Sequence, residues 1–85
     1  MESDSTQARI EHGIAELRGA FPGITLCHAA LQSWREGAQA RHSLWLDLRW
    51  PEHQSIVSGP ACASAEEALQ AGFDKARNLL GGAHA

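Results

Sequence analysis

The residues of this chain that could do acid–base or metal chemistry are five histidines and two cysteines. They are His12, His28, His42, His53, His84, Cys27 and Cys62. A zinc site needs such side chains at short, regular spacing, as in C-x-x-C or in histidines one helical turn apart. The chain has neither pattern, and it has no glycine-rich phosphate loop and no G-x-S-x-G nucleophile motif. The sequence therefore predicts a protein that is not an enzyme and that uses no metal ion, cofactor or small-molecule substrate.

The cysteines and one histidine have structural explanations instead. Cys27 and Cys62 lie among apolar or small residues, which favours buried free thiols over a disulfide. His28 shares its parity with Ile24 and Leu26, the parity that we assign to the covered face of a strand. We therefore expect His28 to be a hydrogen-bonded core histidine.

The strongest candidate binding residues lie in RHSLWLDLRW, from Arg41 to Trp50. Leucines alternate here with polar residues, a pattern that predicts a half-buried strand. Trp45 falls on the polar side, four residues from Arg41 and four from Arg49. Asp47 on the same side is expected to form a solvated ion pair with Arg49.

Two roles are open for Trp45. It packs against Leu31 or Cys27 of a neighbouring strand, or it anchors a contact with RNA or with another protein chain. The other two tryptophans, Trp34 and Trp50, match buried parities at strand ends, and we expect both to close the small core.

Length and charge limit the classes of protein that fit. The chain has 85 residues, 44% of them hydrophobic, which predicts a single folded domain over 1–85 with frayed ends at 1–4 and 81–85. The formal net charge of −3 argues against a generic nucleic-acid binder. No apolar run approaches the roughly 20 residues of a membrane span, and no secretory signal is seen. We expect a cytoplasmic protein without membrane contact.

Five elements must position these residues. The patterns predict helices over 5–20 and 64–80, and strands over 24–34, 41–50 and 54–59. The loop at 35–40 contains a glycine, and the turn at 51–53 begins with proline. Ser64 and Glu67 form a capping box at the start of the second helix. The order predicts an α+β two-layer sandwich, α-β-β-β-α, in which both helices cover one face of a three-stranded antiparallel sheet.

This order of elements is that of double-stranded-RNA-binding domains. Those domains carry a basic motif, K-K-x-A-K, at the start of the last helix. Here the same place reads SAEEAL, with Glu66 and Glu67. The acidic residues argue against ordinary binding of double-stranded RNA.

A second resemblance, over about residues 8–80, is to the family of short ribosome hibernation-promoting factors and ribosome-associated inhibitors. GITLCHAAL resembles the family's V-x-V-H-V-x-L strand, RHSLWLDL its R-H-x-x-x-x-x-L strand, and ASAEEALQAGFDKARNLL its last helix. The family's first strand and basic tail have no counterpart here. The resemblance implies a dsRNA-binding-like fold and binding to ribosomal RNA in the decoding channel of the small subunit. The implied contact residues are Arg41, His42, Trp45, Arg49, Lys75 and Arg77.

Two functional hypotheses follow. The first is a non-enzymatic ribosome- or RNA-associated regulator of translation. The second is a small protein-interaction module that is homodimeric through the open sheet face or a sheet edge. A continuous basic surface made by Arg41, Arg49, Lys75 and Arg77 would favour RNA, and a Trp45 surrounded by apolar side chains would favour protein.

Overall fold

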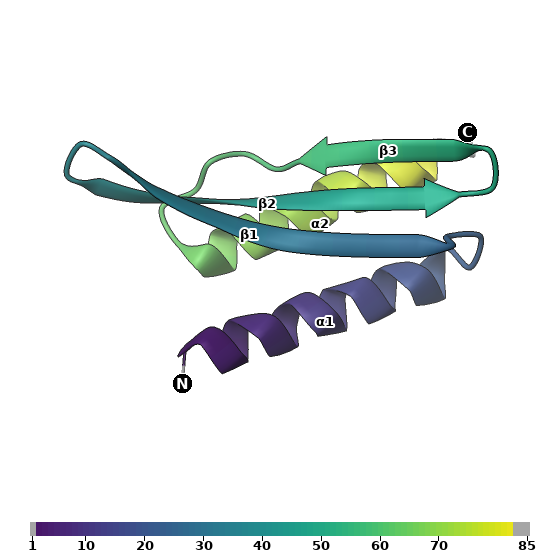
Figure 1. Ribbon diagram of the computed structural model, residues 1–85, viewed down its shortest axis with the longest axis horizontal. Coiled ribbons are helices and arrows are strands. Elements are labelled where there is room, and N and C mark those ends of the chain that lie inside the picture. Colours follow the sequence, from purple (N-terminus) through teal and green to yellow (C-terminus); the bar gives the residue numbers. More distant parts are fainter. Residues whose placement is uncertain (1, 83–85) are drawn as a thin grey trace.

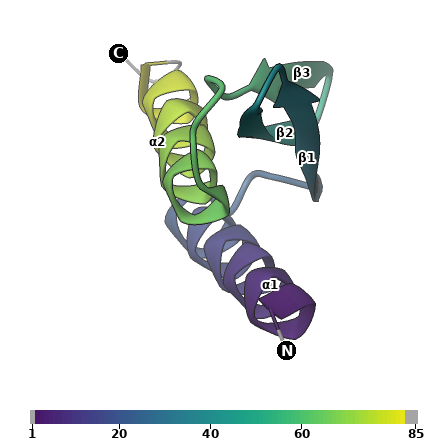
Figure 2. The ribbon, with the colours of Figure 1, turned by 90° about the vertical axis from the view of Figure 1, so that its left-hand side faces the viewer.

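The computed structural model describes residues 2–82, which fold in the order α-β-β-β-α. The elements are α1 (Glu2–Ala20), β1 (Leu26–Glu36), β2 (Gln39–Trp50), β3 (His53–Ser58) and α2 (Ala65–Gly82). The strands form one antiparallel sheet in the order β1-β2-β3 (Figure 1). Figure 2 shows α2 beside one face of the sheet, and α1 running from that side past the edge of β1. The predicted α+β sandwich is confirmed.

The two strand connections are tighter than predicted. Gly37 and Ala38 alone join β1 to β2, and Gly37 has a φ of 63°. A glycine with positive φ at the first turn position is typical of a type II′ hairpin turn. Between β2 and β3, Pro51 is followed by Glu52, which has a φ of 67°. Proline and then a left-handed residue fit a type II turn, here without the usual glycine.

The register of the sheet overturns the predicted parity of β1. Leu31 lies opposite Leu44, and Cys27 lies opposite Leu48. The residues of β1 on the leucine side of the sheet are therefore Cys27, Ala29 and Leu31, because paired residues share a face. Ile24 is buried, but it precedes the strand, so it belongs to no alternation. The prediction failed because it counted the parity from Ile24.

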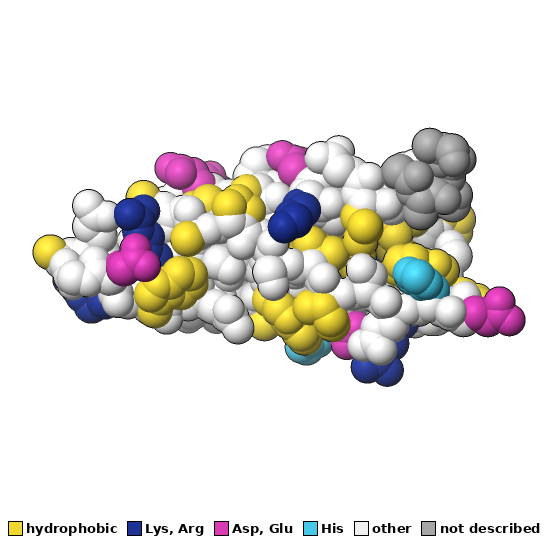
Figure 3. All heavy atoms as spheres, turned by 90° about the horizontal axis from the view of Figure 1, so that it is seen from above, with side chains coloured by type: hydrophobic (Ala, Val, Ile, Leu, Met, Phe, Trp, Pro, Cys, Tyr) yellow, Lys and Arg dark blue, Asp and Glu magenta, His cyan; other side chains and the backbone are white. Residues whose placement is uncertain are grey.

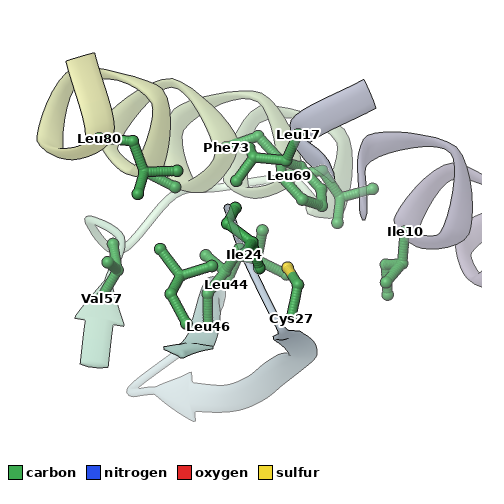
Figure 4. Close-up of a cluster of buried hydrophobic side chains, with 12 residues drawn as sticks. Ile10, Leu17, Ile24, Cys27, Leu44, Leu46, Val57, Leu69, Phe73 and Leu80 are labelled. Atoms are coloured by element: carbon green, nitrogen blue, oxygen red, sulfur yellow. The ribbon is translucent and has the colours of Figure 1, made fainter. Parts of the chain in front are cut away.

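The core lies between the helices and the sheet face that carries Leu44, Leu46 and Leu48, called the leucine face below (Figure 4). The side chains of Leu44, Leu46 and Leu48 are fully buried, as is Leu17 of α1. Ile10 and Leu17 face the core from α1, as the helical spacing predicts. The residues that α2 contributes are Leu69, Phe73, Ala76 and Leu80.

Two glycines allow the layers to approach closely. A Cβ on Gly72 of α2 would lie 2.6 Å from the Cβ of Leu44. A Cβ on Gly13 of α1 would lie 2.5 Å from the ring of Phe73. Neither position has room for a larger residue unless its neighbour moves, so the two glycines set the spacing of α2 from the sheet and of α1 from α2.

The predicted capping box at the start of α2 would have two hydrogen bonds between Ser64 and Glu67, and one of them is present. The backbone amide of Glu67 donates to the Ser64 hydroxyl at 3.1 Å. This bond satisfies a donor at the helix start that has no partner within the helix. Glu66 also pairs with Arg9 of α1 at 2.6 Å, and this exposed ion pair links the two helices.

Candidate interaction surface on the open sheet face

The sheet face away from the helices, called the open face below, is the candidate functional surface. Its residues follow from the strand register. They are Leu26, His28, Ala30, Gln32, Trp34 and Glu36 of β1, Gln39, Arg41, Ser43, Trp45, Asp47 and Arg49 of β2, and Gln54, Ile56 and Ser58 of β3. Three predicted contact residues, Arg41, Trp45 and Arg49, are among them.

Trp45 lies in the middle of the open face and is half-buried. It is opposite Ala30 on one side and Ser58 on the other. The His28 ring meets the indole edge to face, with ring centres 6.2 Å apart. The predicted packing on Leu31 or Cys27 is wrong, because both residues lie on the leucine face. His28 is exposed beside Trp45 and is not the core histidine that the sequence suggested.

Asp47 is the buried charge of the open face, only 9% exposed. Its carboxylate accepts a hydrogen bond from Gln54 Nε2 at 3.0 Å and another from Arg49 at 3.3 Å. The bond from Gln54, followed by the bond and the positive charge of Arg49, holds the pKa of Asp47 below its usual range, although burial opposes them. The expected solvated pair with Arg49 is therefore a nearly buried carboxylate with two donors.

Arg41 and Trp34 lie opposite each other at the far end of the face. Arg41 contacts Glu36 at 3.5 Å and donates to Gln39 at 2.7 Å, so its charge is balanced locally. Trp34 is 39% exposed and does not close the core as predicted. Its ring is available to a binding partner.

The other three predicted contact residues lie away from the open face. The imidazole of His42 is 2.8 Å from the Ser33 hydroxyl, and both residues lie on the helix side of the sheet. On α2, Lys75 donates to the Ser58 carbonyl and Arg77 pairs with Asp74. The predicted basic residues therefore form no continuous basic surface. On the side of the molecule in Figure 3, Lys and Arg are also scattered.

Sequence reasoning missed the neighbours that give the open face its character, namely His28, Leu26, Gln54 and Ile56. Leu26 is 41% exposed and Ile56 is 50% exposed. The sequence places Leu26 on the covered face together with Ile24, which is wrong, and it assigns Ile56 to neither face. Only the register of β1 and β3 against β2 shows that they flank Asp47 and Arg49.

The concave parts of the molecule lie elsewhere. A groove between α1 and α2 contains Arg9, Glu66 and His12. Arg9 pairs with Glu66 across the groove, and the His12 ring lies 2.7 Å from the Glu16 carboxylate along α1. An apolar pocket lies where the end of α1 meets Trp50 and Leu80.

No protein-family model, no curated protein and no solved structure matches the chain. In the part of the chain that the structure describes, no His, Cys, Asp or Glu cluster is arranged to hold a metal ion. Over residues 2–82, neither helix is both long and apolar enough to cross a membrane. Cys27 and Cys62 are free thiols, Cys27 buried and Cys62 half-buried. The pKa of the Cys27 thiol is raised, and burial is the main cause.

Proposed function

We propose that this chain is a non-enzymatic ribosome- or RNA-associated regulator that contacts RNA through the open face. The observation that carries the proposal is the set of ring side chains on that face. Trp45 and His28 lie at its middle, Trp34 lies at one end, and an arginine stands near each end. An uncovered sheet with aromatic side chains suits unstacked RNA bases, which stack on such rings.

The element order gives further support, because α-β-β-β-α is the order of double-stranded-RNA-binding domains and, apart from the family's additional first strand, of the hibernation factors. The ordered matches in β1, β2 and α2 point to the same class. The activity implied by that class is occupancy of a site on the small ribosomal subunit, with no chemical step.

The charges favour stacking over phosphate neutralisation as the main source of affinity. Arg41 and Arg49 each have a carboxylate partner, and Lys75 and Arg77 lie on another side of the molecule. The open face can then neutralise at most about two phosphates, when both arginines are released from their carboxylates. For single-stranded RNA this predicts a slope of roughly −1.4 in log affinity against log salt.

Co-sedimentation with ribosomes on sucrose gradients, over a series of salt concentrations, tests the proposal. We expect the protein in the small-subunit fraction at low salt and its gradual release as the salt concentration rises. Its absence from every ribosomal fraction at low salt would refute the ribosomal part of the proposal.

Binding of single-stranded RNA oligonucleotides tests the surface itself. Trp45→Ala removes a stacking platform worth about 1–3 kcal/mol per base, so we expect a loss of affinity of about 5- to 150-fold. Lys75→Ala is the control, since it removes a positive charge from outside the open face and should change the affinity little. Equal losses in the two variants would show that binding does not use this face.

Exposed Leu26 and Ile56 favour a second candidate, a small protein-interaction module. Aliphatic side chains offer no stacking surface to bases, but they are ordinary components of protein interfaces. On this alternative the open face binds a protein chain and not RNA. The RNA oligonucleotides would then show no binding even to the unmodified protein.

A further inference from the structure

The carboxylate of Asp47 is held in place on the open face by donors from two strands. Its side chain is only 12% exposed, against 51% for Arg49. Gln54 of β3 donates to Oδ1 at 3.0 Å, and Arg49 of β2 donates to Oδ2 at 3.3 Å. A group whose position is already fixed in the free protein costs little to organise when a ligand binds.

The same carboxylate can still accept hydrogen bonds. An ionised carboxylate offers about four lone-pair sites, and Gln54 and Arg49 occupy one on each oxygen. These two donors lie opposite each other in the sheet, at the end of the face beyond Asp47. Trp45 lies on the other side of Asp47, two residues earlier in β2. The donors therefore leave the side of Asp47 that adjoins Trp45 to a ligand.

The surroundings of Trp45 leave space for a flat ligand. Its register partners, Ala30 and Ser58, have small side chains, and so does Ser43 two residues before it. Two residues of a strand span about 6.6 Å, and a hydrogen bond to a carboxylate takes about 2.8 Å of this distance. The remaining distance of about 4 Å is close to half the width of a nucleobase. A base stacked on Trp45 can therefore turn one edge to Asp47.

We propose that Trp45 and Asp47 together select guanine at one position of a bound single-stranded RNA. The Watson–Crick edge of guanine has two adjacent donors, the N1–H and the N2 amino group, and both can donate to one carboxylate. Adenine and cytosine place an acceptor beside their single amino group, and uracil places its single N–H between two carbonyl oxygens. A carboxylate repels those acceptors, so guanine is the base that fits.

This inference rests on the proposed function and adds a base preference to it. It also gives a role to the charge of Asp47, which would otherwise only repel RNA. Arg49 lies beside that charge and balances it. Hydrogen bonds to an ionised acceptor are stronger than those between neutral groups, and a good two-bond contact to a base discriminates by about 5- to 150-fold.

Fluorescence anisotropy with short labelled oligouridylates tests the preference. One central nucleotide carries guanine, adenine, cytosine or uracil, and the rest of the oligonucleotide is unchanged. The guanine oligonucleotide should bind about 5- to 150-fold more tightly than the other three. Equal affinities would overturn this inference and leave the proposed function standing. Absence of binding by all four would reject both.

An oligonucleotide with hypoxanthine at the central position tests the two-donor contact in the unmodified protein. Hypoxanthine keeps the N1–H of guanine but lacks the N2 amino group. We expect its affinity to lie between those of the guanine and adenine oligonucleotides. Equal affinity for hypoxanthine and guanine would overturn the contact between Asp47 and both donors.

Asp47→Asn tests the residue, because it replaces one acceptor oxygen by an amide donor. The ratio of the guanine affinity to the adenine affinity should fall to about one. Asp74→Asn is the matched control, since it removes the same charge from α2 and should keep the preference for guanine. A preference that persists in Asp47→Asn would overturn the inference. If this variant does not fold, the hypoxanthine comparison decides the question.

Discussion

The two faces of the sheet are made by the same three strands, yet their side chains differ in how deeply they are buried and in what they contact. On the leucine face, Leu44, Leu46 and Leu48 are fully buried, with α2 packed against β2. On the open face, Leu26 and Ile56 are about half-exposed, and a hydrogen-bonded carboxylate lies between their strands. The difference shows that stability depends mainly on one face, which leaves the residues of the other face free to be selected for binding.

The largest expected effect comes from truncating matched aliphatic residues on the two faces. Leu46→Ala leaves a cavity beneath α2 and should lower the free energy of unfolding by about 2–5 kcal/mol. Ile56→Ala, on the open face, should lower it by less than about 1 kcal/mol, since half of that side chain is already in water. Urea denaturation measures both, and similar losses would contradict the division between the faces.

A smaller effect is expected where α2 touches the leucine face. Gly72→Ala forces a Cβ into Leu44, and the resulting overpacking should cost about 1–3 kcal/mol of stability. Gly19→Ala in α1 is the control, since a Cβ there has no neighbour within 4 Å. The control should be neutral or raise stability by up to about 1 kcal/mol. Thermal unfolding of the two variants compares them, and a neutral Gly72→Ala would mean that the layers are less tightly spaced.

The smallest effect concerns the carboxylate of the open face. The pKa of Asp47 is lowered in the folded state, so its contribution to stability is present above the unfolded value of about 3.9 and is lost as the pH falls through the lower folded value. Asp47→Asn should therefore reduce the loss of stability between about pH 5 and pH 2, as measured by urea denaturation at each pH.

Asp74→Asn provides the comparison on α2, where the pKa of Asp74 is lowered chiefly by its hydrogen bond with Arg77. Its effect on the acid dependence should add to that of Asp47→Asn, because the two groups share no partner. An acid dependence that Asp47→Asn leaves unchanged would mean that the Gln54 and Arg49 bonds do not persist in solution.

The fold was predictable because its signals are local. Helical spacing of apolar residues marked α1 and α2, and the alternation of leucines marked the leucine face of β2. The parity of β1 was not predictable, because Ile24 is buried without belonging to the strand. That single apolar residue moved His28 from the open face to the core in the sequence-based assignment.

The open face was only half predictable, for a related reason. Arg41, Trp45 and Arg49 alternate on one strand, so the sequence alone places them together. Gln54 and His28 reach the same surface from other strands, and their approach to Asp47 depends on register. The sequence groups Lys75 and Arg77 with the open face only because both are basic. Their place on another side of the molecule depends on how α2 packs against the sheet.

The hairpin that joins β1 to β2 has a practical use. Its tip at Gly37 and Ala38 is exposed, as are the flanking residues from Gln32 to Ala40, and Figure 1 shows this end of the hairpin reaching past both helices. Exposed hairpin tips are places where proteins accept inserted segments. A dye or an affinity tag inserted there would report on binding at the open face while leaving both layers of the sandwich intact.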